Sequence, residues 1–221
     1  ITGYALAEVV GRNPSLLASG RHGKAYFVAM WRGLLDKGHW YGEIWNRRKD
    51  GSVFAAMQTI GAVRDDQGRT REYVSLFSDI TSIKEHEQQL EHIAHYDVLT
   101  GLPNRRLLRD RLAQEIRKCK RENLKFALLF IDLDHFKEVN DTLGHDHGDL
   151  LLIEAARRLR ACVREFDTVA RMGGDEFTVI LTQLTEERHL DRILAKLLRS
   201  MEDVFHLKDE KIFVSASIGI T

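Results

Sequence analysis

Acidic residues at the end of an apolar segment are the first candidates for chemistry in this chain. In the segment ALLFIDLD, Asp132 follows five apolar residues, and Asp134 would share its side of a strand because side chains alternate between faces. A lone ionised carboxylate in apolar surroundings is costly unless it is paired or bound to a cation. Asp132 is therefore predicted to lie at the open end of its strand, satisfied by backbone amides, or to bind a metal ion.

A second pair of acids follows two glycines in the segment TVARMGGDEFTVILT. Gly173 and Gly174 predict a hairpin between two strands. We expect the strand TVARM to pair near ALLFID, so that the bend brings Asp175 and Glu176 to the sheet end that carries Asp132. Converging carboxylates repel one another unless a cation neutralises them, and Mg²⁺ takes oxygen ligands of this kind together with water and substrate phosphates. Glycine also lets a polyphosphate approach the backbone. The pattern favours a magnesium-dependent site.

The polar segment DHFKEVNDTLGHDHGD lies between these acids. Lys137 is a candidate contact for a phosphate. Asn140 and Asp149 are the types of residue that read guanine, because an amide binds its carbonyl edge and a carboxylate accepts from N1–H and the exocyclic amine. The alternative is that Asn140 caps the end of one helix and Asp149 the start of the next.

Three histidines in the same region raise the alternative of a zinc site. Zinc sites usually combine histidine with cysteine or with ligands from separate elements. A single short polar loop without cysteine is weak evidence for one, so zinc is not favoured. The histidines are His135, His145 and His147.

Composition excludes some classes of partner. Lys plus Arg and Asp plus Glu each total 33, so no overall basic field attracts nucleic acid or an anionic membrane. The longest apolar run, FALLFI, is far shorter than the roughly 20 residues that span a bilayer. Two cysteines suggest no disulfide framework. We expect a cytoplasmic globular chain without nucleic-acid or membrane contacts. Both ends look cut, which is typical of a piece of a longer protein such as a membrane-anchored receptor.

The order of predicted elements gives an α+β fold in three parts. Residues 1–81 show a helix at 25–36 and then strands joined by the turns KDG and DDQG, which predict an antiparallel sheet. Residues 82–95 form a helical linker. Residues 96–221 continue as helix, strand, helix, helix, strand, strand, helix and strand, which predicts a mainly antiparallel sheet flanked by helices. The last helix is expected over 186–205 and the last strand over 212–220.

The linker has a heptad pattern with one charged interruption. This pattern favours a two-stranded coiled coil and hence a homodimer. The alternative is an amphipathic helix that lies on a neighbouring domain. The positions of the seam are Ile80, Ile83, Glu87, Leu90 and Ala94.

Three separated motifs resemble the GGDEF diguanylate cyclases over residues 96–221: DVLTGLPNRR, FIDLDHFKEVNDTLGHDHGD and ARMGGDEF. Residues 1–81, with TGY, GRNP, WNRRKDG and the closing DIT, are similar to a PAS sensor domain that lacks its first strands. In the family, the cyclase domain continues past the last strand seen here with a helix and a strand that carry basic phosphate contacts. A phosphodiesterase domain of the EAL type often follows.

The resemblance implies a signal-regulated enzyme that condenses two GTP into cyclic di-GMP and two pyrophosphates across a dimer. It implies Mg²⁺ or Mn²⁺ as the cofactor. The implied catalytic residues are Asp175 and Glu176, and the implied metal ligands are Asp132, Asp175 and the carbonyl of Leu133. The implied substrate contacts are Phe136, Lys137, Asn140, Asp149 and the backbone of Gly174.

The resemblance also implies inhibition by the product. REFD matches the family's inhibitory R-x-x-D pattern, with Arg164 binding a phosphate or guanine and Asp167 accepting from guanine. An ordinary salt bridge between residues i and i+3 is the alternative.

Two other functions remain open. The first is a non-catalytic module that binds GTP or cyclic di-GMP and controls a downstream phosphodiesterase. The second is a sensor only, whose PAS pocket binds FAD, haem or a small metabolite.

Overall fold

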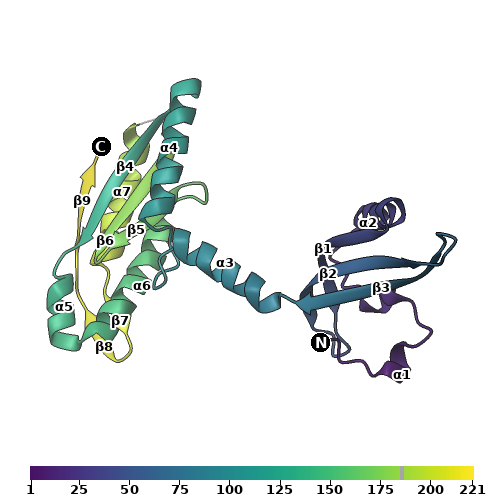
Figure 1. The fold of residues 1–221 in the computed structure, drawn as a ribbon. Coiled ribbons are helices and arrows are strands. Elements are labelled where there is room, and N and C mark those ends of the chain that lie inside the picture. The colour runs from purple at the N-terminus through teal and green to yellow at the C-terminus, as the bar shows by residue number, and fades with distance from the viewer. Residues whose placement is uncertain (185–186) are drawn as a thin grey trace. The chain divides into compact units, whose positions relative to one another are not determined.

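The computed structural model describes residues 1–184 and 187–221 and confirms the expected mixture of helices and antiparallel sheets (Figure 1). The chain divides into two compact units, Ile1–Gln89 and Leu90–Thr221. The boundary between them lies inside the predicted linker. No helix in the described residues is long and apolar enough to cross a membrane.

The first unit is a three-stranded antiparallel sheet with short helices. The order β1-β2-β3 follows from two consecutive hairpins, as the turn residues predict. A small core forms where Met30 and Leu34 of the longest helix pack against Ile44 and Ile60 of the sheet. The elements are α1 (Leu6–Val9), the 3₁₀ helix η1 (Pro14–Leu17), α2 (Lys24–Lys37), β1 (His39–Arg47), β2 (Val53–Arg64) and β3 (Thr70–Asp79).

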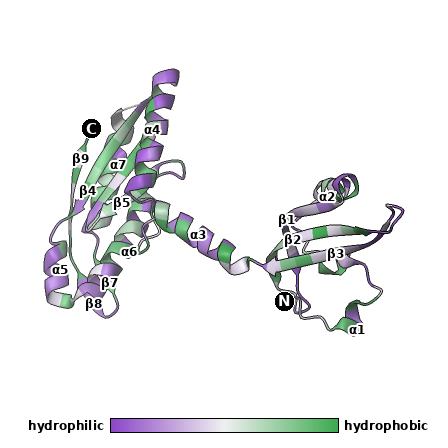
Figure 2. Cartoon of the chain, in the orientation of Figure 1, coloured by the Kyte–Doolittle hydropathy of each residue, from purple (hydrophilic) through white to green (hydrophobic). Residues whose placement is uncertain are grey.

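Helix α3 (Thr81–His95) forms the predicted linker and buries none of its residues. The carboxylate of Asp79 accepts hydrogen bonds from the backbone N–H of Thr81 at 3.0 Å and from its hydroxyl at 2.6 Å, which fixes the start of the helix. The seam residues Ile83 and Leu90 are 54% and 68% exposed. Figure 2 shows hydrophilic and hydrophobic residues alternating along α3. The apolar stripe of the linker is therefore available for packing.

The second unit is built on a four-stranded antiparallel sheet of order β5-β6-β4-β9. The strand TVARM lies near ALLFID in the same sheet, as expected, but does not pair with it directly, because β6 separates β5 from β4. The elements are α4 (Arg105–Glu122), β4 (Lys125–Leu133), α5 (Phe136–Leu143), α6 (His145–Cys162), β5 (Thr168–Gly173), β6 (Glu176–Leu184), α7 (Glu187–Glu202), β7 (Phe205–Leu207), β8 (Glu210–Ile212) and β9 (Ala216–Ile220).

The two faces of this sheet are covered differently. Odd-numbered residues of β4, such as Leu129 and Ile131, pack into the main core with α6 and α7. Even-numbered residues face the side of α4, where Leu108 packs against Ala170 and Ile180. Asp132 is even-numbered and so belongs to the face that α4 covers. The main core thus fixes the sheet from behind and leaves the acidic end of β4 toward solvent.

The last predicted helix and strand differ from the structure. Glu186, the first residue of the predicted helix, lies outside the described residues, and α7 ends at Glu202 rather than 205. The guanidinium of Arg158 donates to the carbonyls of Ser200, Asp203 and Val204 and lies 3.7 Å from the ring centroid of Phe205. These bonds satisfy one carbonyl in the last turn of the helix and two carbonyls just after it, and the chain continues as the hairpin β7–β8. The predicted strand 212–220 is accordingly shortened to β9.

Candidate active site

Two carboxylates lie side by side at the ends of the two inner strands of the sheet. Asp132 is the register partner of Glu176 in the antiparallel pair β4–β6, and Asp175 immediately precedes β6. Side chains of directly opposed residues have Cβ atoms about 5 Å apart. Burial and then repulsion from Asp175, Glu176 and Asp134 raise the pKa of Asp132 above its ordinary value. The structure therefore places the three acids that the sequence predicts at the same end of the sheet.

The bend before these acids needs glycine. Gly173 and Gly174 have φ angles of +137° and +54°, which non-glycine residues rarely adopt. A Cβ built on either glycine would meet no atom within 4 Å, so open space surrounds the backbone of the turn. A ligand can approach the main chain here without displacing a side chain.

Arg171 holds this turn in place. Its Nε and Nη2 donate to the carbonyl of Gly174 at 3.0 and 2.8 Å, and its Nη1 donates to both carboxylate oxygens of Asp97 at 3.0 and 3.1 Å. Burial works to raise the pKa of Asp97, but hydrogen bonds from Thr100 and Arg171 outweigh it and lower the pKa. The Gly-Gly turn is therefore tied to the segment that follows α3.

Asp134 has a different environment from Asp132. Its carboxylate accepts from the hydroxyls of Ser215 at 2.5 Å and Ser217 at 2.8 Å, and these bonds lower its pKa. The neighbouring Leu133 has a buried side chain and pairs with Ala216 of β9. Asp134 thus joins the end of β4 to the strand beside it, whereas Asp132 is left without a positive partner among the described residues.

The donor set suits a divalent cation that retains other ligands. Among the described residues, no three His, Cys, Asp or Glu side chains gather as a ready cluster around one point. Asp132, Asp175 and Glu176 offer only oxygen atoms, which match Mg²⁺ or Mn²⁺, and Mg²⁺ is commonly held by one or two carboxylates together with substrate phosphates. Burial and then the charges of the neighbouring acids raise the pKa of Asp132, and a bound cation would offset both effects.

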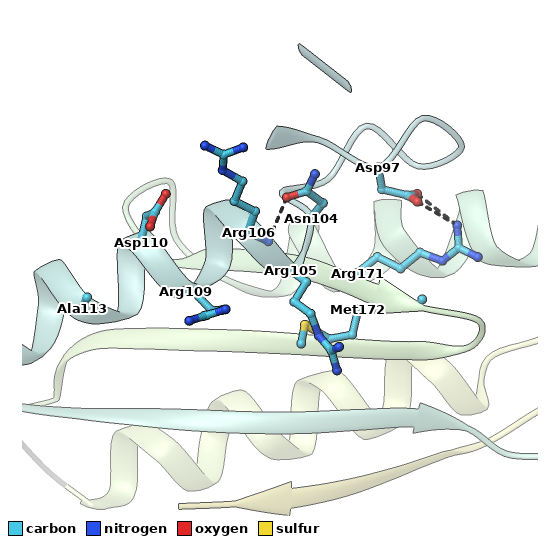
Figure 3. Close-up of a pocket in the computed structure, with 10 residues that line it drawn as sticks. Asp97, Asn104, Arg105, Arg106, Arg109, Asp110, Ala113, Arg171 and Met172 are labelled. Atoms are coloured by element: carbon cyan, nitrogen blue, oxygen red, sulfur yellow. Dashed lines mark hydrogen bonds and ion pairs between the residues drawn. The ribbon is translucent and has the colours of Figure 1, made fainter. Parts of the chain in front are cut away.

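One cavity is lined by two of these acids, and a second cavity shares Arg105 and Met172 with it. The first, of about 480 Å³, contains Asp132, Glu176 and the buried Thr178 in its lining. The other, of about 810 Å³, is lined by three arginines of α4 and by Arg171 (Figure 3). Arg105 lines both. Acids that suit a metal ion therefore lie beside a basic surface that suits phosphate groups. The three arginines of α4 are Arg105, Arg106 and Arg109.

Comparison with known proteins agrees with this geometry. Residues 94–221 match the family described as diguanylate cyclase, GGDEF domain, and residues 1–82 match the PAS domain. The chain belongs to the GGDEF family. The predicted order of a PAS domain followed by a GGDEF domain is confirmed.

The relatives of this GGDEF chain are bacterial signalling proteins. It is 47% identical over 140 residues to the bifunctional diguanylate cyclase/cyclic di-GMP phosphodiesterase MucR of Pseudomonas aeruginosa, covering 63% of this chain and 20% of that protein. It is 42% identical over 139 residues to the diguanylate cyclase TpbB of the same species, covering 62% and 32%. The chain thus spans a third or less of the length of either relative.

A solved GGDEF structure supports the fold. The GGDEF domain of PA1120 (TpbB or YfiN) from Pseudomonas aeruginosa superimposes with a TM-score of 0.56 at 43% identity, covering 57% of this chain and 74% of that one. The match is confined to about the length of the second unit.

The residues predicted to read guanine lie at a helix corner of the GGDEF domain. Asn140 is inside α5, and Asp149 is in the second turn of α6, which begins at His145. Neither residue is a helix cap, so the alternative roles considered for them are wrong. Gly144 alone separates the two helices. Asn140 is half-buried and Asp149 is exposed.

Other predicted substrate contacts are spread over the same corner. Lys137 is exposed on α5, and Phe136 is partly buried against the main core. Of the nearby histidines, His135 pairs with Glu138, and Nδ1 of His147 lies 2.9 Å from the carbonyl of Leu143. None of these residues lines the cavity that contains Asp132.

The predicted inhibitory motif borders a third cavity, of about 490 Å³. Arg164 and Arg160 are exposed there, and Arg111 is half-buried. Asp167 is buried, and its carboxylate accepts from the backbone N–H groups of Arg164 at 3.0 Å and Thr182 at 2.9 Å. The ordinary salt bridge between the two side chains is absent from the described residues. Asp167 shapes the loop, and the arginines present the charge.

Sequence reasoning did not assign roles to Asp97 and Arg171. Both belong to motifs that were recognised, DVLTGLPNRR and ARMGGDEF. The sequence signal for Arg171 was a lone arginine in an apolar strand, two residues before a turn. A charge in such a strand needs a partner, and the side chain of Arg171 is indeed only 11% exposed.

We predict that Asp132→Asn raises the thermal stability of the second unit in metal-free buffer at pH 7. The folded state holds this carboxyl at a raised pKa, so its ionised form costs stability above that pKa, and the cost disappears below the ordinary value of 3.8. The gain should therefore shrink as the pH falls toward 4. Asp134→Asn is the matched control and should lower stability, because it weakens the bonds to Ser215 and Ser217.

Calorimetry would measure both variants, and added Mg²⁺ should stabilise the parent chain but not Asp132→Asn. All three tryptophans lie in the first unit, so their fluorescence provides an internal reference that should not change. A lower melting temperature for Asp132→Asn would contradict the repulsion.

Proposed function

We propose that this chain is the sensor and catalytic part of a signal-regulated diguanylate cyclase that forms cyclic di-GMP from two GTP across a homodimer. The observation that carries the proposal is the pairing of Asp132 with Glu176, with Asp175 in the adjoining glycine turn. Membership of the GGDEF family and the names of MucR and TpbB support the same reaction.

Each half of the reaction is a phosphoryl transfer. The 3′-oxygen of one GTP forms a bond to the α-phosphorus of the other, the bond from that phosphorus to the α–β bridging oxygen breaks, and pyrophosphate leaves. The 3′-hydroxyl loses its proton to a base. Two such steps close the ring and release two pyrophosphates. Catalysis in this class depends on positioning and on stabilising phosphate charge.

The chain's residues divide these tasks. Asp132 and Asp175, with the carbonyl of Leu133, would hold Mg²⁺ or Mn²⁺, which supplies positive charge to the phosphates when bound. Glu176 would support that site or accept the proton of the attacking hydroxyl. The open backbone of Gly174 would receive the phosphates. Contacts from α5 and α6 complete the site: Lys137 would bind a phosphate, Asn140 and Asp149 would bind guanine, and Phe136 would pack beside the substrate.

Control would reach the site through α3. The exposed stripe at Ile83 and Leu90 fits a two-stranded coiled coil, which would set the separation of two GGDEF domains. The tie from Asp97 through Arg171 to Gly174 begins two residues after α3 ends. A PAS signal, with FAD or haem as candidate ligands, would then change the population of competent dimers. An absorption spectrum of the purified protein tests for either ligand.

The second candidate is a non-catalytic module that binds GTP or cyclic di-GMP and controls a phosphodiesterase. The similarity to MucR, a bifunctional diguanylate cyclase/cyclic di-GMP phosphodiesterase, favours keeping this candidate. The two candidates are distinguished by incubating the protein with GTP and Mg²⁺: the non-catalytic module would form no cyclic di-GMP.

We predict that Asp175→Ala abolishes formation of cyclic di-GMP by the full-length protein, because the variant removes an oxygen ligand at the glycine turn. Loss of one well-placed charged group costs on the order of a hundredfold or more in rate. Asp191→Ala, an exposed change on α7, is the control and should retain activity. Chromatography of the nucleotides formed from GTP and Mg²⁺ measures the effect. Undiminished product from Asp175→Ala would refute the site assignment.

We predict that Leu90→Glu lowers cyclic di-GMP formation per molecule, because like charges in the seam weaken pairing of the two α3 helices. Gln89→Glu, the neighbouring exposed position, adds the same charge off the seam and should have little effect. Activity is measured over a range of protein concentrations alongside light scattering. Equal activity of Leu90→Glu and the parent would reject control through the linker.

We predict that Arg164→Ala weakens inhibition by cyclic di-GMP without reducing the initial rate. The change removes a cation from the 490 Å³ cavity. Asp132 lines a different cavity, so the acidic site keeps all its residues. Arg157→Ala, an exposed arginine of α6, is the control. Initial rates at increasing product concentration give the inhibition constant. An unchanged constant would remove Arg164 from the inhibitory site.

A further inference from the structure

Gly148 of α6 lies against the side chain of Asn140 on α5. A Cβ built on Gly148 would stand 1.9 Å from Oδ1 of Asn140, 2.9 Å from its Cγ and 3.3 Å from its Nδ2. Real Cβ atoms do not approach other heavy atoms so closely. The side chain of Asn140 therefore occupies the space that any other residue at position 148 would fill.

The backbone does not require glycine at this position. Gly148 is buried in the first turns of α6 and is not among the residues with positive φ. Glycine in a helix costs roughly 1 kcal/mol relative to alanine, since it loses more conformational freedom on folding. The reason for glycine here is consequently the close approach of Asn140.

The tight corner between the helices creates this contact. The N–H of Gly144 donates to the carbonyl of Asn140 at 2.9 Å and ends α5, and the N–H of Gly148 donates to the carbonyl of Gly144 at 3.3 Å and begins α6. With only Gly144 between the helices, residue 140 meets residue 148. Asp149, the other predicted guanine ligand, is the next residue along the chain.

Packing, rather than hydrogen bonding, fixes the amide of Asn140. Among the described residues its side chain forms no hydrogen bond, so its donor and acceptor atoms are available to a ligand. Its position is limited by the bare backbone of Gly148. A methyl group there would displace the end of the Asn140 side chain, which can rotate away without unfolding the corner.

We propose that Gly148 is a positioning residue that sets the selectivity of this site for guanine over adenine by making room for Asn140 beside Asp149. The proposal rests on the proposed function, since it assumes that Asn140 and Asp149 read the base. If the amide of Asn140 is turned away, the carbonyl of guanine loses its hydrogen-bond donor. Adenine has no carbonyl at this position, so its binding does not depend on that hydrogen bond.

The test measures binding of two nucleotides that cannot react. The α,β-methylene analogue of GTP and its adenosine counterpart have no cleavable α–β bridging oxygen, so calorimetry with Mg²⁺ and the full-length protein reports affinity alone. Gly148→Ala should weaken the guanine analogue by about tenfold, the loss of roughly one hydrogen bond, and should leave the adenine analogue unchanged.

A double-mutant cycle with Asn140→Ala separates positioning from a general disturbance. If Gly148 acts through Asn140, then Gly148→Ala has no further effect on guanine affinity in the Asn140→Ala background. A parent-like guanine affinity for Gly148→Ala would overturn the inference. The same loss in both backgrounds would also overturn it, because the effect would then be independent of Asn140.

Whether the variants fold is a second test of the inference. If Gly148→Ala fails to fold, the double variant should fold because it lacks the clashing amide, and failure of both variants would refute the inference. The proposed function fails separately: a parent protein that binds the two analogues equally would show that the site does not read guanine at all. Loss of selectivity only in the variant leaves the proposed function intact.

Discussion

Repulsion between carboxylates on two adjacent strands is the constraint on which the rest of the GGDEF domain depends. Asp132 and Glu176 are register partners at the rim of the sheet, and Asp175 adds a third charge in the turn. Such an arrangement is unfavourable by itself: burial first, and then repulsion from the neighbouring acids, raises the pKa of Asp132. It persists because the main core behind the sheet is well packed, with Leu129, Ile131 and Phe177 almost fully buried.

The surroundings keep the acids in place without neutralising them. Arg171 could have paired with the acids of the turn, but its guanidinium bonds to Asp97 and to the carbonyl of Gly174. Asp134 is satisfied by two serines of the β8–β9 region. Neither Arg171 nor the two serines therefore neutralises Asp132, whose negative charge is the one that the proposed metal ion would meet. The arginines of α4 lie beside it, where phosphates would need them.

Much of the fold was predictable because its signals are local. Hairpins follow from KDG and from the Gly-Gly turn, and the site acids follow from their position at strand ends. Which strand of the Gly-Gly hairpin pairs with β4 was not predicted, because both strands of the hairpin are apolar. The longer buried run of β6 was the available sign that it is the inner strand, covered on both faces.

Features that depend on tertiary contacts could not be predicted. The polar residues from His145 to Asp149 resemble a loop, and only the packed corner at Gly144 shows that they are helical and that Asn140 is no cap. The end of α7 depends on Arg158, which is distant in sequence. Asp167 has the spacing of a ligand, but its carboxylate is engaged by the backbone, which no motif reveals.

The central claim is tested most directly by a crystal structure of the full-length protein with Mn²⁺ and the α,β-methylene GTP analogue. The site to inspect lies in the second unit. Anomalous scattering would locate the manganese ion. The account predicts one ion bound by the carboxylates of Asp132 and Asp175 and by oxygens of the triphosphate. A nucleotide whose phosphates and metal ion lie away from these two residues would contradict it.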